Sequence, residues 1–194
     1  MKKRIRLGYL LLIILTMICC SGCGEKTAPP ILTIQDINIT IGSSHLSDLT
    51  SNGFMPTFTG NQMVIGDLSG KSRLADTISF KKDNNTYARV HIYNPDKNSK
   101  SYEQSVICQL EFCMHSEEES YWADDNCLVN GINFNGMTSE QVKDAMKEYT
   151  VAAGANTDSL CYEDGAYKYY ISFNEGTGFV EKVIVELVLG EEYN

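Results

Sequence analysis

The residues of this chain best suited to metal binding or nucleophilic catalysis are its seven cysteines and three histidines. His45, His91 and His115 are scattered along the sequence, and no C-x-x-C pair occurs among the last four cysteines, so the spacing typical of a zinc site is missing. The acidic stretch at residues 115–125 lacks the alternating oxygen ligands and the central glycine of a calcium-binding EF-hand loop. The sequence therefore predicts no metal site and no other cofactor.

The sequence contains no G-x-S-x-G, H-E-x-x-H or P-loop motif, each of which places a nucleophile, a metal or a phosphate. Catalysis needs side chains within hydrogen-bond reach of one another, and the dispersed histidines and carboxylates define no such group. We therefore predict a protein that is not an enzyme. A hydrolase whose catalytic groups meet only in the folded chain is the alternative, and a cleft with His91 or His115 among carboxylates of perturbed pKa would favour it.

The first 23 residues have the order of an export signal. Four basic residues within positions 2–6 precede an uncharged run at residues 7–18, and Ser21-Gly22 precedes Cys23. A basic start, a short apolar run and small residues before the cleavage point are typical of a secretory signal peptide. The apolar run is shorter than the roughly 20 residues that a membrane-spanning helix needs.

The end of this segment resembles the lipobox of bacterial lipoproteins, although Cys20 stands where that family usually has leucine. The resemblance implies that residues 1–22 are removed and that Cys23 carries a diacylglycerol thioether as the new N-terminus. Residues 23–30 then form a lipidated tether that holds the protein on the extracytoplasmic face of the cell membrane. An uncleaved N-terminal anchor, or an ordinary signal cut at another bond, is the alternative.

The charge of the remaining chain restricts its partners. Residues 23–194 carry 12 basic and 25 acidic side chains, a net charge of −13. Phosphate backbones need a basic surface, so nucleic acid is excluded as a partner, and electrostatic binding to anionic lipid is disfavoured. The acidity is typical of a soluble surface.

Four cysteines remain outside the signal segment: Cys108, Cys113, Cys127 and Cys161. In an exported chain they permit two disulfides, with three possible pairings. Cys108 and Cys113 share one predicted strand about 16 Å apart, which disfavours a bond between them. Cys108 also follows an apolar alternation and could be a buried free thiol.

Alternating and helical patterns divide residues 31–189 into strands and two helices. Residues 31–41 alternate as one or two strands, and residues 45–51 form a short helix. Thr138 and Gln141 form a capping box before apolar residues at helical spacing. The remaining predicted strands include two hairpins, 77–81 with 86–93 and 167–173 with 179–189, and single strands at 105–113 and 128–134.

The two halves of the chain have a similar order of elements. Residues 37–42, a helix with Leu46 and Leu49, and two strands correspond to residues 132–136, a helix with Val142, and two strands. This order predicts an α+β fold of two similar helix-plus-antiparallel-sheet units, at residues 31–127 and 128–194.

Residues 135–142, Asn-Gly-Met-Thr-Ser-Glu-Gln-Val, followed by a helix and two strands, resemble the unit shared by the outer-membrane assembly factor BamE (SmpA/OmlA) and β-lactamase inhibitor proteins. The inhibitor proteins contain the unit twice and bind a protein on the concave face of the sheet. That resemblance implies the two-unit fold and a protein partner, but it carries over no active-site residue. More broadly, the chain is similar to small uncharacterised lipoproteins of Gram-positive anaerobes.

Aromatic residues near the C-terminus suggest where a partner would bind. Tyr167, Tyr169 and Tyr170, with Trp122, are the predicted recognition surface, because aromatic side chains are enriched in interface hot spots. Packing in the core or along an edge strand is the alternative. We predict a membrane-anchored extracytoplasmic module that binds an envelope protein without catalysis. A cell-envelope hydrolase or a small solute-binding lipoprotein is the alternative function, and a deep apolar pocket would favour the latter.

Overall fold

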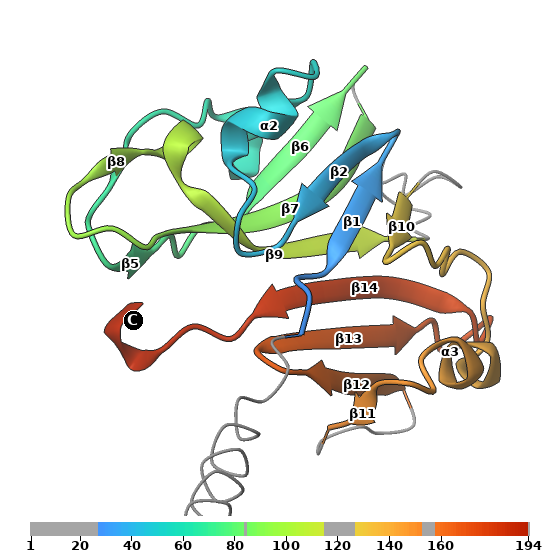
Figure 1. Cartoon of the computed structure of the whole chain (residues 1–194). Coiled ribbons are helices and arrows are strands. Elements are labelled where there is room, and N and C mark those ends of the chain that lie inside the picture. The colour runs from blue at the N-terminus through green and yellow to red at the C-terminus, as the bar shows by residue number, and fades with distance from the viewer. Residues whose placement is uncertain (1–26, 84, 115–126, 153–157, 194) are drawn as a thin grey trace, which may run out of the picture.

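The computed structural model describes residues 27–83, 85–114, 127–152 and 158–193, and its main feature is one nine-stranded antiparallel sheet (Figure 1). Eight of its strands follow the order β11-β12-β13-β14-β9-β7-β6-β3, and β5 pairs beside β7. The strands are β3 (Met55–Thr57), β5 (Ser72–Arg73), β6 (Ile78–Lys82), β7 (Asn85–Asn94), β9 (Val106–Cys113), β11 (Thr150–Val151), β12 (Ser159–Asp164), β13 (Tyr167–Phe173) and β14 (Val180–Leu187).

A second layer covers one face of this sheet. It contains a small sheet of β1 (Ile31–Ile34), β2 (Ile37–Thr40) and β10 (Cys127–Val129), and the helices α2 (Leu46–Thr50) and α3 (Ser139–Ala145). Figure 1 shows β1 and β2 in front of the central strands of the large sheet. The shorter elements are β4 (Asp67–Leu68), β8 (Lys100–Ser101) and the 3₁₀ turns η1 (Thr59–Asn61), η2 (Tyr102–Gln104) and η3 (Glu191–Tyr193).

The register of the strands places one continuous apolar face against this layer. Successive side chains of a strand point to opposite faces, so residues paired across strands share a face. One such row of paired, buried residues crosses six strands: Ile78, Val90, Leu110, Val185, Tyr169 and Tyr162. These residues form one cluster with Leu32 of β1, Leu49 of α2 and Val142 of α3. The shared cluster shows that both helices and the small sheet lie on the same face.

The predicted hairpins are confirmed as β6–β7 and β13–β14. The predicted capping box at the start of α3 is also confirmed, since Thr138 Oγ1 accepts a hydrogen bond from the Gln141 amide and the Thr138 amide donates to Gln141 Oε1. These features depend on contacts a few residues apart, which the sequence specifies directly.

The predicted fold of two similar helix-plus-sheet units is wrong, and so is the architecture that the BamE and β-lactamase-inhibitor resemblance implied. The structure is mostly β, with a single large sheet in which β9 and β14, from the two halves of the chain, pair with each other. The predicted boundary between residues 127 and 128 falls within β10. The helices have only five and seven residues, too few to cover a sheet alone. The physical reason is that each half leaves an open strand edge, which is satisfied by pairing with the other half.

Candidate binding face

The face of the nine-stranded sheet that lies opposite the helices and the small sheet, here called the outer face, is lined mainly by polar and charged side chains. Two rows of paired residues run across it. The first row is Arg89, Glu111, Ile184, Tyr170 and Cys161, and the second is His91, Gln109, Glu186, Lys168 and Glu163. Antiparallel sheets often have one face in the core and one in contact with water, and this alternation follows that rule.

One end of the first row, on β7 and β9, is an ion pair. Arg89 Nη1 lies 3.2 Å from Glu111 Oε1, and the Cys113 thiol donates a hydrogen bond of 3.3 Å to the same oxygen. The side chain of Arg89 is 32% exposed and that of Glu111 is 14% exposed. The pair is therefore partly shielded from water, so its electrostatic attraction is stronger than that of an exposed surface pair.

His91 occupies the second row with both ring nitrogens engaged. Its Nε2 lies 3.2 Å from Thr77 Oγ1, and its Nδ1 lies 3.4 Å from the Leu74 carbonyl oxygen. Burial and then the Arg73 charge lower the pKa of His91, against the opposing effects of the Leu74 carbonyl, Glu111 and Glu186. A neutral ring that donates to Leu74 and accepts from Thr77 satisfies both contacts. Both ring nitrogens are therefore engaged by groups of the protein itself.

Several other polar side chains of the outer face are also paired. The Tyr170 hydroxyl donates to Glu186 Oε1 at 3.1 Å, and burial, followed by the Glu186 charge, raises the pKa of Tyr170 to about 12. Lys168 Nζ lies 3.2 Å from Glu163, and Arg73 donates to Gln109 at 2.9 Å. These contacts fix the side chains of the outer face before any partner arrives.

The predicted recognition tyrosines do not share one surface. Tyr169 is 1% exposed and lies in the core, where its ring packs edge-to-face against Tyr149 at 5.1 Å and its hydroxyl accepts a 3.4 Å hydrogen bond from Asn130 Nδ2. Tyr167 is half-buried on the same face as Tyr169, whereas Tyr170 lies on the outer face. Tyr169 therefore packs in the core, which was the alternative to a role in recognition. Trp122 lies outside the described residues.

Cys108, Cys113 and Cys161 are free thiols in this structure. Cys161 on β12 and Cys113 on β9 are separated by β13 and β14, which corresponds to about 14 Å at normal strand spacing, beyond the reach of a disulfide. Cys108 is buried beside Tyr93 and Val106 at the opposite end of β9 from Cys113, and Cys127 is buried on β10. Cys23, the predicted lipidation site, lies outside the described residues.

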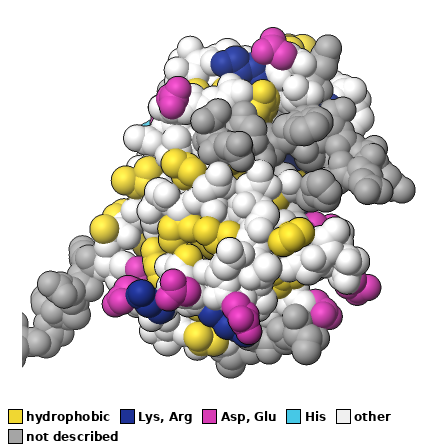
Figure 2. Space-filling model, turned by 90° about the vertical axis from the view of Figure 1, so that its right-hand side faces the viewer, with side chains coloured by type: hydrophobic (Ala, Val, Ile, Leu, Met, Phe, Trp, Pro, Cys, Tyr) yellow, Lys and Arg dark blue, Asp and Glu magenta, His cyan; other side chains and the backbone are white. Residues whose placement is uncertain are grey.

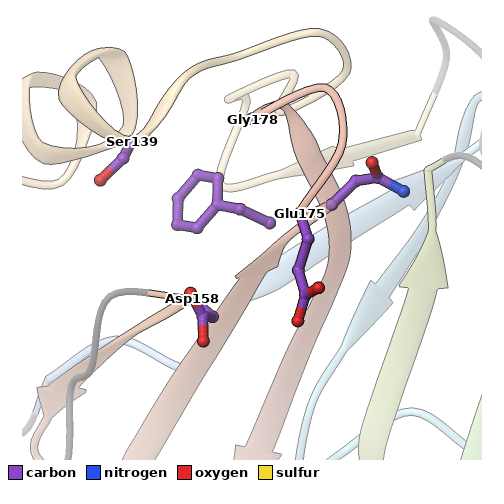
Figure 3. A pocket seen from close by; sticks show the side chains of 6 residues that line it. Ser139, Asp158, Glu175 and Gly178 are labelled. Atoms are coloured by element: carbon purple, nitrogen blue, oxygen red, sulfur yellow. The ribbon is translucent and has the colours of Figure 1, made fainter.

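A shallow cavity of about 230 Å³ lies between the start of α3 and the β13–β14 hairpin. Figure 3 shows Ser139, Asp158 and Glu175 around it, well separated, with the Glu175 carboxylate pointing away from Ser139. No histidine lines the cavity. This arrangement lacks the hydrogen-bonded nucleophile and base of a hydrolytic site.

The side of the molecule that carries α3 and β10 has a mixed surface. Figure 2 shows apolar side chains across the middle of this side and acidic side chains along its lower part. Elsewhere in the described chain Met55, Met63 and Ile65 are also exposed. In the described ranges no group of three or more His, Cys, Asp or Glu side chains is arranged to hold a metal ion. Within those ranges, too, no helix is both long and apolar enough to cross a membrane.

The sequence contained part of the signal for the outer face. Arg89 and His91 alternate with Val90 and Ile92, as expected for a strand with one polar face, and a bulge after His91 then shifts the pattern. Gln109 and Glu111 show the same polar alternation on the neighbouring strand β9, but the sequence did not identify them as the partners of His91 and Arg89. Which strand lies next to which cannot be read from alternation alone.

Comparison with known proteins adds no relative: no family model, no curated protein and no solved structure matches this chain.

Proposed function

We propose that this protein is a lipid-anchored, extracytoplasmic module that binds another protein of the cell envelope on its outer face, without catalysis. The observation that carries the proposal is the outer face itself: a broad sheet surface whose polar side chains are ordered by contacts among themselves. Side chains that are already fixed lose little conformational entropy when a partner binds.

The size of the outer face suits a protein partner better than a small solute. The eight strands of its hydrogen-bonded path contain 49 residues in all. At about 3.3 Å along the strand and about 4.8 Å between strands for each residue, they cover close to 800 Å². A standard protein–protein interface buries about 800 Å² of each partner. Arg89 and Tyr170 are also residue types that are enriched in interface hot spots.

The anchoring part of the proposal rests on the signal segment. Thr27, the first described residue, lies against Gly165 in the β12–β13 turn: a Cβ atom added at Gly165 would be 2.9 Å from Thr27 Oγ1. The described chain therefore begins beside this turn. A lipid on Cys23 would then hold this end of the sheet near the membrane. Replacing Cys23 by serine should abolish the acyl mass and release the protein from the membrane fraction, as read by mass spectrometry and fractionation. Unchanged membrane retention with an uncleaved N-terminus would instead support the uncleaved anchor.

A crosslinking pull-down tests the binding part. The bait is the full chain in detergent, the prey is the envelope extract of its own host, and heat-unfolded bait is the control. Wild-type bait should enrich one envelope protein. The Lys168→Ala/Tyr170→Ala variant should enrich that protein at least about tenfold less, because it removes two outer-face contacts. The matched control, Lys143→Ala in α3 together with Lys147→Ala just after it, should retain it. Equal enrichment by both variants would contradict the outer face as the binding surface. No enrichment, with wall-degrading activity in the purified chain, would favour the hydrolase.

A further inference from the structure

At one corner of the large sheet, where β3 pairs with β6, the outer face continues into an open depression of about 590 Å³. Thr57 stands opposite Ser79, and Ser79 stands opposite Arg89, so the depression extends the first row of the outer face. Its lining includes Met55, Thr57, Asn61, Lys81, Lys82 and Asp83.

The hydroxyl of Thr57 is the first unusual feature of this corner. Thr57 is only 8% exposed, and its Oγ1 is the buried side-chain oxygen or nitrogen atom that lacks a hydrogen-bond partner within the part of the chain that the structure describes. Buried polar groups in folded proteins are nearly always paired, because an unpaired group loses its contacts with water and gains nothing in return. Thr57 also lines the depression, so a ligand that reached this part of its wall would give the unpaired hydroxyl a partner.

The second feature is a pair of lysines that form no ion pair with the described carboxylates. Lys81 Nζ donates to Asn61 Oδ1, and Lys82 Nζ lies 5.2 Å from the centre of the Phe54 ring. Among the described residues neither ammonium group has an acidic partner in an ion pair, whereas Lys100, Lys147 and Lys168 each do. Asp83 is the one carboxylate among the lining residues, so the depression has a net positive charge in an otherwise acidic protein.

We propose that this corner binds an anionic oxygen group, a carboxylate or a phosphate, attached to an apolar carbon skeleton. Lys81 and Lys82 supply the positive charge, and the Thr57 hydroxyl donates to the anionic oxygen. The side chain of Met55, 66% exposed, covers the apolar part of the ligand. This site does not depend on a protein partner, because every contact comes from the depression itself.

Methyl NMR on the full chain in detergent, labelled at methionine, tests the site. The Met55 signal is assigned by its loss in Met55→Leu, and the probes are benzoate, phenyl phosphate and neutral benzamide at fixed ionic strength. Benzoate or phenyl phosphate should shift the Met55 signal saturably with a Kd at least about tenfold below that of benzamide. The tighter of the two anions identifies the carboxylate or the phosphate as the preferred group. Equal binding of benzamide would overturn the proposal.

Two lysine variants test whether the positive charge inside the depression, rather than the charge of the protein in general, binds the anion. Lys81→Gln should raise the Kd for the anionic probe about tenfold, and Lys147→Gln, an exposed lysine on the α3 side, should leave it unchanged. If both variants bind alike, general attraction explains the shift and the proposal fails. A normal methyl spectrum of each free variant shows that it folds. These results are independent of the pull-down, so either proposal can fail alone.

The Thr57→Val variant is expected to change stability and anion binding in opposite directions. Replacing the unpaired hydroxyl by a methyl group should raise the thermal midpoint of the free protein and weaken anion binding at least about threefold. A lower midpoint with unchanged anion binding would show that the hydroxyl already has a partner, such as an ordered water, and would overturn its role in the site.

Discussion

Two adjacent tyrosines on β13 allow a sharp test of which face of the large sheet belongs to the core. Tyr169 is 1% exposed, while its neighbour Tyr170 lies on the outer face with its hydroxyl on Glu186. Both are tyrosines at the middle of the same strand, so each variant is the other's control for chain position and residue type. We expect Tyr169→Ala to destabilise the fold severely and Tyr170→Ala to destabilise it little.

The expected size of the difference follows from their contacts. Tyr169 packs between Val185 and Tyr162 and meets Tyr149 edge-to-face, and removing a buried aromatic ring of this kind costs about 3–5 kcal/mol of unfolding free energy. Tyr170→Ala removes one hydrogen bond and a half-buried ring, which corresponds to about 1 kcal/mol. The two variants should therefore differ by at least about 2 kcal/mol.

Urea unfolding of the full chain in detergent, followed by circular dichroism, measures this difference at constant pH. Tyr169→Phe is the conservative control, because it keeps the ring and removes only the hydroxyl with its contacts to Asn130 and Tyr149, and it should cost about 1 kcal/mol. An equal loss of stability for the two alanine variants, or a larger loss for Tyr170→Ala, would refute the assignment of the faces. It would also remove the basis for placing the binding surface on the outer face.

Two further measurements address the outer face. A double-mutant cycle with Arg89→Met and Glu111→Gln, measured by urea unfolding, should give a coupling energy of about 1–2 kcal/mol. This value lies between those of exposed and fully buried ion pairs. A coupling energy near zero would show that the ion pair does not stabilise the fold. Burial, followed by Glu111, raises the pKa of Cys113 to about 12, and burial raises that of Cys108 to about 11. Since an unfolded cysteine titrates near about 8.5, the folded chain holds more protons above that pH, so stability is full below about pH 8.5 and falls as pH rises further. Cys108→Ser/Cys113→Ser should flatten this fall between about pH 8.5 and 10, and an unchanged slope would contradict the raised pKa values.

The sequence predicted the local parts of the fold well and its assembly poorly. Alternation and turn residues are enough to define the β6–β7 and β13–β14 hairpins, because their partners are neighbours in the chain. Residues 31–41 became two strands through a turn at Gln35 and Asp36, both of which have positive φ without being glycine. The usual asparagine–glycine signal for such a turn is missing, so its position was not predictable.

Long-range pairing is the part that the sequence did not reveal. Pairing between β9 and β14 joins residues about seventy positions apart, and β10 joins β1 across almost a hundred. Nothing in an isolated strand specifies its partner beyond a compatible alternation of apolar and polar residues. The similar order of elements in the two halves therefore suggested two separate sheets, when the strands of both halves in fact extend one.

The tyrosines predicted as a recognition surface lie on different faces for a related reason. Three tyrosines at positions 167, 169 and 170 look like a cluster in the sequence, but a strand turns alternate side chains to opposite faces, so Tyr169 and Tyr170 cannot share a surface. The outer face is instead made of residues from several strands, such as Arg89 with Glu111 and Tyr170 with Glu186. Only the register of the folded sheet brings them together.

Charge also restricts what the corner formed by β3 and β6 can bind. With a net charge of −13 expected for residues 23–194, the surface as a whole repels anions, and Lys81 and Lys82 attract them only at short range. At physiological salt the repulsion from distant carboxylates is screened beyond about 8 Å, whereas a contact with the lysines is screened less. A compact ligand with one anionic group can therefore be bound, while a polyanion would extend its remaining charges over the acidic surface. The corner should thus select a small anion with an apolar body, and the same balance of charges argues against nucleic acid as a ligand.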